Sequence, residues 1–298
     1  MMDAGLKALL QPEVLNSMNG LELIARIIVE GFMSGSNKSQ AIGIGQEFSQ
    51  YRNYEPGDDL RQLDWKMYAR SERYFVKQAE IETNITVKFM IDASRSMSYQ
   101  EENITKLQYA KVIAAALAFL SRKQGDTFGL YAVNNNQVNI VHPRFEQQQF
   151  MRFLHELVGL KAESTWKKDG IEQLFDHHGK ELLIFITDLY DEDGDLYEFM
   201  SRLKTSRNEV IVFHVVGKTE MTLDHGGSFT FKDLETGGVV KVDTVAQKKE
   251  YIERLNQWIQ HARNTLLEKG IAYQTLVMNE NPGEALRDFL KHRKRLLR

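Results

Sequence analysis

The segment Lys88–Ser98 reads KFMIDASRSMS and joins an apolar run to an unusual ending. The residue that stops the run is Asp92, and hydroxyl side chains follow at Ser94 and Ser96. A strand that simply ends is usually followed by Gly, Pro or Asn. Here acidic and hydroxyl side chains stand between a strand and the next helix. The segment therefore predicts a strand whose carboxyl end carries functional acidic and hydroxyl side chains.

Outward from this segment, short apolar runs alternate with helical patterns. The predicted strands are Thr86–Ile91, Thr127–Val133, Leu182–Thr187, Val210–Val215 and Ala272–Leu276. The predicted helices are Lys106–Arg122, Glu146–Val158, Asp169–Asp176, Leu196–Thr205 and Ala246–Glu268. Runs such as ELLIFIT are apolar on both faces, which is typical of a parallel strand covered by helices. The alternation predicts the α/β class, with a doubly wound, mainly parallel sheet.

The domain organisation follows from where this alternation begins. Residues 84–298 hold the strands and helices, with a hairpin predicted as an insertion near 228–242. Residues 1–83 begin with a helical pattern at Leu21–Met33 and continue as a polar, charged and aromatic stretch. This stretch has too little apolar material for a separate core. We therefore expect residues 1–83 to be a helical and irregular extension docked on the main domain.

Composition narrows the functional class. The 298 residues carry a formal net charge of −3, which argues against a general nucleic-acid binder. Cys is absent, which excludes disulfides and zinc–thiolate sites. No apolar run approaches the ~20 residues of a membrane helix, and the first residues lack a signal-peptide core. We expect a cytoplasmic protein that neither binds nucleic acid nor inserts into a membrane.

Carboxylate and hydroxyl side chains gather at one predicted edge of the sheet. In a doubly wound sheet, ligands bind outside the carboxyl ends of the strands. Asp92 and Asp188 each follow a predicted strand, and Thr165 lies in a loop that can reach the same edge. With Ser94 and Ser96 they form an all-oxygen set that suits Mg²⁺, with Mn²⁺ or Ca²⁺ as alternatives. Helix capping also explains the DASRS pattern, but Thr165 and Asp188 favour a metal site.

Two parts of the sequence resemble known families. Asp92, Ser94, Ser96, Thr165 and Asp188 resemble the metal-ion-dependent adhesion site of von Willebrand factor A domains. Upstream, the run RNYEPGDDLRQLDWKMYAR is similar to the hallmark block of the bacterial family called domain of unknown function 58. The hairpin FTFKDLETGGVVKVD and the ending NPGEALRDFLKHR are also similar to that family. The resemblance implies a von Willebrand factor A-like domain over residues 84–298.

The upstream block allows two interpretations. Its charged and aromatic members are Arg52, Asp58, Asp59, Arg61, Asp64, Trp65 and Arg70. The acids and arginines can form charge-assisted hydrogen bonds that hold an irregular segment, with the tryptophan as an apolar anchor. The same side chains could instead form a recognition surface for a partner. The sequence leaves both interpretations open.

The family resemblance implies a non-enzymatic, metal-dependent protein-interaction module. Such proteins look like companions of MoxR-type AAA+ ATPases with chaperone-like roles. On this reading the chain is an adaptor or co-chaperone whose metal binds an acidic side chain of the ATPase or its client. The alternative is a metal-dependent phosphoester hydrolase that uses Asp92 and Asp188. The sequence lacks the acids that such a hydrolase needs. An aspartyl phosphatase has a second acid two residues after its nucleophile, and position 94 is Ser. A two-metal site needs three or four acids, and Asp92 and Asp188 are the obvious ones here.

Overall fold

The computed structural model describes residues 9–36, 48–54, 63–79, 85–134, 138–166, 174, 180–190, 195–224, 227–234 and 237–296. The chain forms two compact units. One unit joins Met1–Phe32 to Asn84–Arg298, and the other is Met33–Thr83. Residues 1–83 are thus divided between the two units, with the first 32 residues belonging to the main one.

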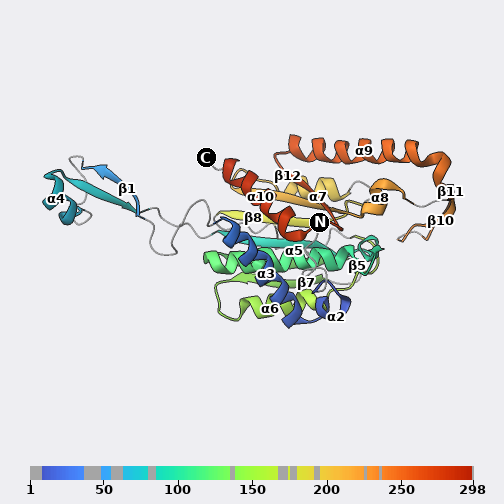
Figure 1. Ribbon diagram of the computed structural model, residues 1–298, viewed down its shortest axis with the longest axis horizontal. Helices are drawn as coiled ribbons and strands as arrows, with labels where there is room; N and C mark the ends of the chain where they lie inside the picture. Colours follow the sequence, from blue (N-terminus) through green and yellow to red (C-terminus); the bar gives the residue numbers. More distant parts are fainter. Residues whose placement is uncertain are drawn as a thin grey trace. The chain divides into compact units, whose positions relative to one another are not determined.

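The main unit is built on a six-stranded sheet with the order β12-β9-β8-β3-β6-β7 (Figure 1). Its strands are β3 (Thr86–Asp92), β6 (Thr127–Val133), β7 (Val138–Arg144), β8 (Glu181–Thr187), β9 (Asn208–Val216) and β12 (Ala272–Val277). Every neighbouring pair is parallel except β6 and β7. The predicted class, a doubly wound and mainly parallel α/β sheet, is confirmed.

The edge strand β7 is the one strand of this sheet that the sequence pattern did not predict. It pairs antiparallel with β6, and its side chains are mostly half-buried or exposed. It also contains Pro143, which suits an edge strand because proline cannot donate to a ladder. A short, polar strand of this kind lacks the long apolar run that marks the buried strands.

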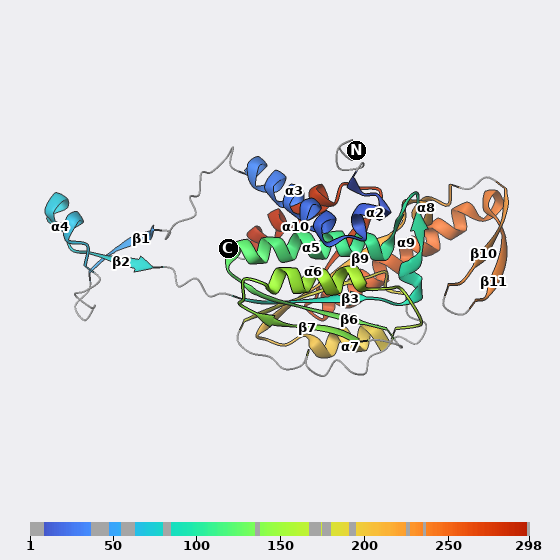
Figure 2. The same cartoon turned by 90° about the horizontal axis from the view of Figure 1, so that it is seen from below.

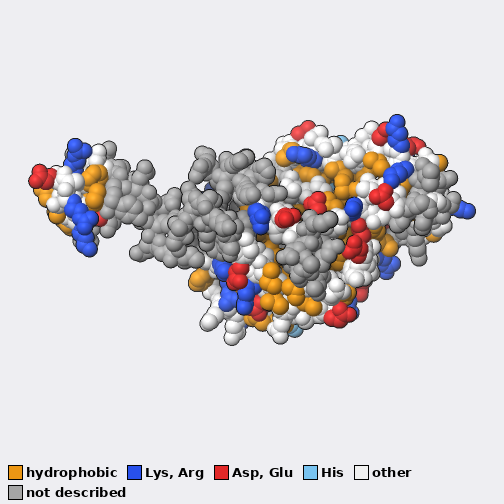
Figure 3. All heavy atoms as spheres, viewed as in Figure 1, with side chains coloured by type: hydrophobic (Ala, Val, Ile, Leu, Met, Phe, Trp, Pro, Cys, Tyr) orange, Lys and Arg blue, Asp and Glu red, His pale blue; other side chains and the backbone are white. Residues whose placement is uncertain are grey.

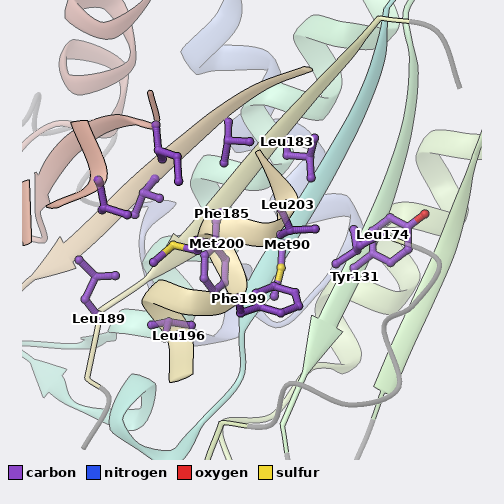
Figure 4. Packing of buried hydrophobic residues seen from close by; sticks show 14 of the residues in the cluster. Met90, Tyr131, Leu174, Leu183, Phe185, Leu189, Leu196, Phe199, Met200 and Leu203 are labelled. Atoms are coloured by element: carbon purple, nitrogen blue, oxygen red, sulfur yellow. The ribbon is translucent and has the colours of Figure 1, made fainter. Parts of the chain in front are cut away.

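Helices cover both faces of the sheet (Figure 2). They are α5 (Lys106–Gln124), α6 (Gln149–Gly159), α7 (Asp195–Leu203), α9 (Thr244–Glu268) and α10 (Pro282–Leu296). Successive side chains of a strand point to opposite faces, so Phe89 meets Phe153 of α6 at 5.4 Å between ring centroids. Met90, on the other face, joins a buried cluster with Phe199 of α7 and Leu266 of α9. Figure 4 shows Met90 and Phe185 beside Phe199 and Met200.

The N-terminal helix belongs to the core of the main unit. Helix α2 (Pro12–Leu15) precedes α3 (Met18–Ser36), whose Leu21 and Ile24 are fully buried. Ile28 of α3 shares a small apolar cavity with Leu117 of α5 and Leu286 of α10. This layer of helices therefore seals the outer side of α5, which is itself buried over most of its length.

The second unit is a two-stranded sheet with one short helix. Strands β1 (Phe48–Asn53) and β2 (Phe75–Ala79) pair antiparallel, and α4 (Trp65–Ser71) lies between them in sequence. Tyr68 of α4 stacks on Tyr74 with ring centroids 4.5 Å apart. Helix α4 has no buried side chain.

The remaining elements lie near the carboxyl ends of the strands. They are the 3-10 turn η2 (Arg95–Ser98), β4 (Gln100–Glu101), β5 (Ile104–Thr105), α8 (Lys218–Thr222), β10 (Ser228–Lys232) and β11 (Val239–Asp243). Strands β10 and β11 form the predicted hairpin. The predicted helix over residues 169–176 falls outside the described residues, apart from Leu174. Among the described helices, none is both long enough and apolar enough to cross a membrane.

Candidate metal centre

The strand order reverses between β3 and β8. From β3 the chain continues outward to β6 and β7, whereas β8, β9 and β12 build the sheet in the opposite direction. Such a switch point is where open α/β sheets bind ligands, at the carboxyl ends of the strands. Asp92 ends β3 and Asp188 directly follows β8. The topology therefore places the two predicted carboxylates at the two sides of this switch point.

Asp92 is held from two directions and is 1% exposed. Its Oδ1 accepts a hydrogen bond from the backbone N–H of Ser94 at 2.9 Å. Its Oδ2 accepts one from the Thr187 hydroxyl at 2.7 Å. The first contact folds the chain back after the strand, and the second joins the ends of β3 and β8. These two hydrogen bonds fix Asp92 in position.

A row of oxygens connects Ser94 to Asp188. The two hydroxyl oxygens of Ser94 and Ser96 are 3.0 Å apart, and Ser96 Oγ donates to Asp188 Oδ1 at 3.1 Å. Neighbouring ligands of an octahedral ion with bonds near 2.1 Å stand ~3.0 Å apart by right-angle geometry. All of these side chains are buried. The spacing and the all-oxygen chemistry fit a hard divalent cation such as Mg²⁺.

Thr165 lies on a loop that is bonded to the same turn. The backbone N–H of Arg95 donates to Ser164 O at 2.7 Å, and that of Glu163 donates to Ala93 O at 3.0 Å. Thr165 follows directly and is exposed. The loop is therefore fixed beside the serine turn by its backbone, but Thr165 is exposed whereas Ser94, Ser96 and Asp188 are buried.

Burial dominates the electrostatics of Asp92. Removal from water, together with the nearby charge of Asp188, raises the pKa of Asp92 to about 7, although the hydrogen bonds from Ser94 and Thr187 act in the opposite direction. A carboxylate in this position is costly to ionise on its own. A divalent cation would supply the missing positive charge.

Lys106 already brings one positive charge to this centre. The residue is 6% exposed, and its Nζ lies 3.1 Å from Asp188 Oδ2 and 2.9 Å from Glu220 Oε1. Burial alone would lower the pKa of Lys106, but the attraction of the two carboxylates outweighs it and the net shift is upward. Lys106 is therefore a permanent cation beside the candidate ligands.

Three side chains of this centre were not predicted from the sequence. They are Thr187, which donates to Asp92, Lys106, which donates to Asp188, and Glu220, which accepts from Lys106. Thr187 carried a signal, because it is a hydroxyl residue directly before Asp188 at a strand end. Lys106 and Glu220 are 114 residues apart, and no local pattern relates them.

Two residues of the loops at this edge adopt backbone conformations that side chains rarely take. Leu189 has a φ of 57° and Ser164 has a φ of 61°. Non-glycine residues in this region carry strain that the surrounding structure must hold in place. Leu189 is buried, and its N–H donates to the Thr187 hydroxyl at 2.9 Å. The strain thus lies directly next to Asp188 and Thr165.

The Arg/Asp-rich block lies in the second unit and is described only in part. Asp64 Oδ1 caps α4 by accepting from the N–H groups of Lys66 and Met67. Trp65 is 61% exposed and meets Tyr68 edge to face, and Arg70 is exposed. The side chain of Arg52 and the whole of Asp58, Asp59 and Arg61 are outside the described residues. The network between them stays a prediction.

A family model decides the relationship of this chain to known proteins. The model described as "Protein of unknown function DUF58" matches residues 50–261. The chain belongs to this family. The match contains both the Arg/Asp-rich block and the candidate metal centre, so the family resemblance seen in the sequence is confirmed.

Individual proteins similar to this chain are distant from it in sequence. The uncharacterized proteins Mb1516 of Mycobacterium bovis and Rv1480 of Mycobacterium tuberculosis are each 24% identical to this chain over 235 residues, which is 76% of this chain and 73% of theirs.

Solved structures with a similar fold are also distant from this DUF58 chain. BatB from Bacteroides thetaiotaomicron has 13% identity and a TM-score of 0.44. An aerotolerance-related membrane protein from Bacteroides fragilis has 17% identity and a TM-score of 0.45. Each comparison covers 70% of this chain and 98% of the solved chain. Both TM-scores are below 0.5, so the fold of this chain is assigned from its own strand order and register.

Proposed function

We propose that this DUF58 protein is a non-enzymatic interaction module that binds a divalent cation, Mg²⁺ or a similar ion, and uses it to hold an acidic side chain of a partner protein. Asp92, Ser94, Ser96 and Asp188 would hold the ion, and the exposed Thr165 would have to turn toward them to complete the set. The observation that carries the proposal is the oxygen spacing of 3.0 and 3.1 Å along Ser94, Ser96 and Asp188. These hydrogen-bonded oxygens are also spaced closely enough to become neighbouring ligands of a small octahedral ion.

The charge of this ligand set favours capture of a carboxylate. Two of the buried candidate ligands are neutral hydroxyls, and Asp188 shares its charge with Lys106. A cation held by few negative ligands keeps much of its attraction for a further anionic oxygen. A carboxylate of a partner can supply that oxygen, and it is the hard ligand that Mg²⁺ prefers.

The hydrolase alternative receives less support from the geometry. Two-metal hydrolysis needs several acids that converge on two ions about 4 Å apart. Among the described residues, no group of three or more His, Asp or Glu side chains is placed to hold one metal. Among the described residues at the carboxyl ends of β3 and β8, the acids are Asp92 and Asp188, and Asp188 is paired with Lys106.

The partner that we propose is a MoxR-type AAA+ ATPase or the client of such an ATPase. This step rests on the family resemblance and not on a contact in the structure. The proposed role is that of a cytoplasmic adaptor or co-chaperone. The surface is compatible with protein binding, since Figure 3 shows acidic and basic side chains interspersed on the face in view, without one dominant sign of charge.

Capture of the ATPase tests this function directly. The purified protein would be immobilised and exposed to a MoxR-type ATPase from the same organism, with Mg²⁺ or with EDTA. Asp92→Asn should lose capture in Mg²⁺. The matched control is Glu209→Gln, which removes one negative charge at the start of β9, away from the carboxyl ends of the strands. Equal capture in EDTA, or by Asp92→Asn, would contradict a metal-dependent interface.

A further inference from the structure

Lys106 occupies a position that is unfavourable for a cation. It is the first residue of α5, directly after the N-cap Thr105, and the helix continues for 19 residues. The N-terminal end of a helix carries a positive partial charge, so a lysine is disfavoured there. This lysine is also buried, which adds a desolvation cost. Its neighbours must supply a compensating interaction.

Negative charges from the candidate metal centre and from α8 supply this compensation. Nζ of Lys106 contacts Asp188 Oδ2 at 3.1 Å and Glu220 Oε1 at 2.9 Å, and it lies 5.1 Å from the centre of the Tyr99 ring. Glu220 is itself fixed, because its Oε2 accepts from the N–H of Gly217 at 2.7 Å. The ammonium group is thus clamped between two carboxylates on different elements.

The other oxygen of Asp188 belongs to the ligand row. Asp188 Oδ1 accepts from Ser96 Oγ at 3.1 Å and from the N–H of Tyr190 at 3.2 Å. The Asp188 carboxylate therefore contacts the ammonium group of Lys106 through Oδ2 and the hydroxyl of Ser96 through Oδ1. Any cation that reaches the hydroxyl row must share Asp188 with Lys106.

We infer that Lys106 is a resident counter-cation that attenuates divalent-ion binding at the Asp92–Asp188 centre. It neutralises part of the charge of Asp188, and it repels an incoming dication across a buried space where screening is weak. It also keeps the row of ligands assembled in the absence of the ion. This inference rests on the proposed metal function and adds to it a residue that sets the affinity.

Removing the positive charge of Lys106 and removing the negative charge of Glu220 should shift Mg²⁺ affinity in opposite directions. Lys106→Met keeps most of the length of the side chain and removes the charge, so Mg²⁺ should bind at least about tenfold more tightly, since like charges at such distances interact by several RT. Lys106→Arg keeps the charge and should leave the affinity near that of the natural protein. Glu220→Gln leaves the ammonium group with Asp188 alone and should weaken Mg²⁺ binding.

Two matched controls separate this role from general effects. Lys111→Met removes another buried charge from α5, but the Nζ of Lys111 contacts the carbonyl oxygens of Val158 and Leu160 and no candidate ligand. Glu101→Gln removes an acid that accepts from Thr219 N–H of the same helix α8 as Glu220. Both controls should change Mg²⁺ affinity much less than the variants of Lys106 and Glu220.

The experiment is a calorimetric Mg²⁺ titration of these variants at low salt, with thermal melts across the same Mg²⁺ series. The melts keep the test valid if Lys106→Met is unstable, because Mg²⁺ should then raise its melting temperature more than that of the natural protein. Tighter Mg²⁺ binding by Lys106→Met than by the natural protein supports the inference. If the natural protein binds no measurable Mg²⁺ but Lys106→Met does, the inference is still supported, and the result counts only against the proposed function. Unchanged or weaker binding by Lys106→Met would overturn the inference while leaving the metal function standing.

Discussion

Ser96 Oγ donates a hydrogen bond to Asp188 Oδ1 at 3.1 Å, although the two residues are 92 positions apart in the chain. The contact crosses the point where the strand order reverses between β3 and β8. It makes the turn after one strand and the residue after the other into a single polar centre. Lys106 balances the charge of Asp188 within this centre.

Ser96→Ala should affect both stability and ion binding. The variant removes two buried hydrogen bonds, to Ser94 and to Asp188, and should lower the free energy of unfolding by roughly 1 to 3 kcal/mol. It also removes a neutral ligand and should weaken Mg²⁺ binding. Ser121→Ala is the control, because Ser121 is another buried serine whose hydroxyl donates to Leu117 O. Denaturant melts should show a loss for both variants, and titrations should show weaker Mg²⁺ binding for Ser96→Ala alone.

Glu181→Gln should separate the stability of the sheet from the metal centre. Lys88 and Glu181 form a buried ion pair at 2.9 Å, on the amino-terminal halves of β3 and β8. Loss of one partner leaves a buried charge without its counter-ion and should cost about 3–5 kcal/mol of unfolding free energy. Mg²⁺ affinity should stay unchanged. The double change Lys88→Met with Glu181→Leu should cost less than Glu181→Gln, and a larger cost would contradict this interpretation.

Lys111 should make stability depend on pH above neutrality. Burial lowers the pKa of Lys111 to about 8, against about 10.5 for an unfolded lysine. The folded protein therefore disfavours the charged form. The contribution of Lys111 to the free energy of unfolding is most favourable above pH 10.5. It falls by roughly 3 kcal/mol as the pH drops from 10.5 to about 8, and it is constant at lower pH. Urea melts between pH 8 and pH 10 should show a smaller rise of stability with pH for Lys111→Met than for the natural chain. Equal slopes would show that Lys111 is not buried as described.

Removal of residues 33–83 should leave the main unit folded. Residues 1–32 belong to the same compact unit as residues 84–298, so a Gly/Ser linker that replaces the segment should preserve a cooperative thermal melt. Removal of residues 1–83 as a whole should lower the melting temperature, because it uncovers the apolar surface of α5 and α10 that Ile28 contacts. Equal melting temperatures for the two deletions would contradict the place of α3 in the core.

The sequence predicted the buried parts of the fold better than the exposed parts. The central strands such as β8 and β9 were found because burial on both faces leaves a clear pattern, and the half-buried β12 and the hairpin near 228–242 were found as well. The edge strand β7 was missed, because a half-exposed strand mixes polar residues and Pro143 into a short run. The sequence did not indicate that residues 1–32 would join the main unit apart from residues 33–83, since a helical pattern such as that of α3 does not say which core it joins.

The candidate centre could be predicted only where its residues lie next to strand ends. Asp92, Ser94, Ser96 and Asp188 were brought together as expected from a doubly wound sheet. Lys106 and Glu220 could not be foreseen, because their meeting depends on the packing of α5 against the loop that holds α8. Long-range ion pairs leave no periodic signal in a single sequence.

The most direct test is a calorimetric titration of the natural protein with Mg²⁺, beside Asp92→Asn. Asn can still accept from Ser94 N–H through its carbonyl oxygen, so the variant should fold, and it should lose ion binding because it lacks the charge. We predict saturable binding of a single ion to the natural protein and none to Asp92→Asn, with similar melting temperatures in EDTA. Identical titrations of the two proteins, whether both bind Mg²⁺ or neither does, would contradict a metal centre at Asp92.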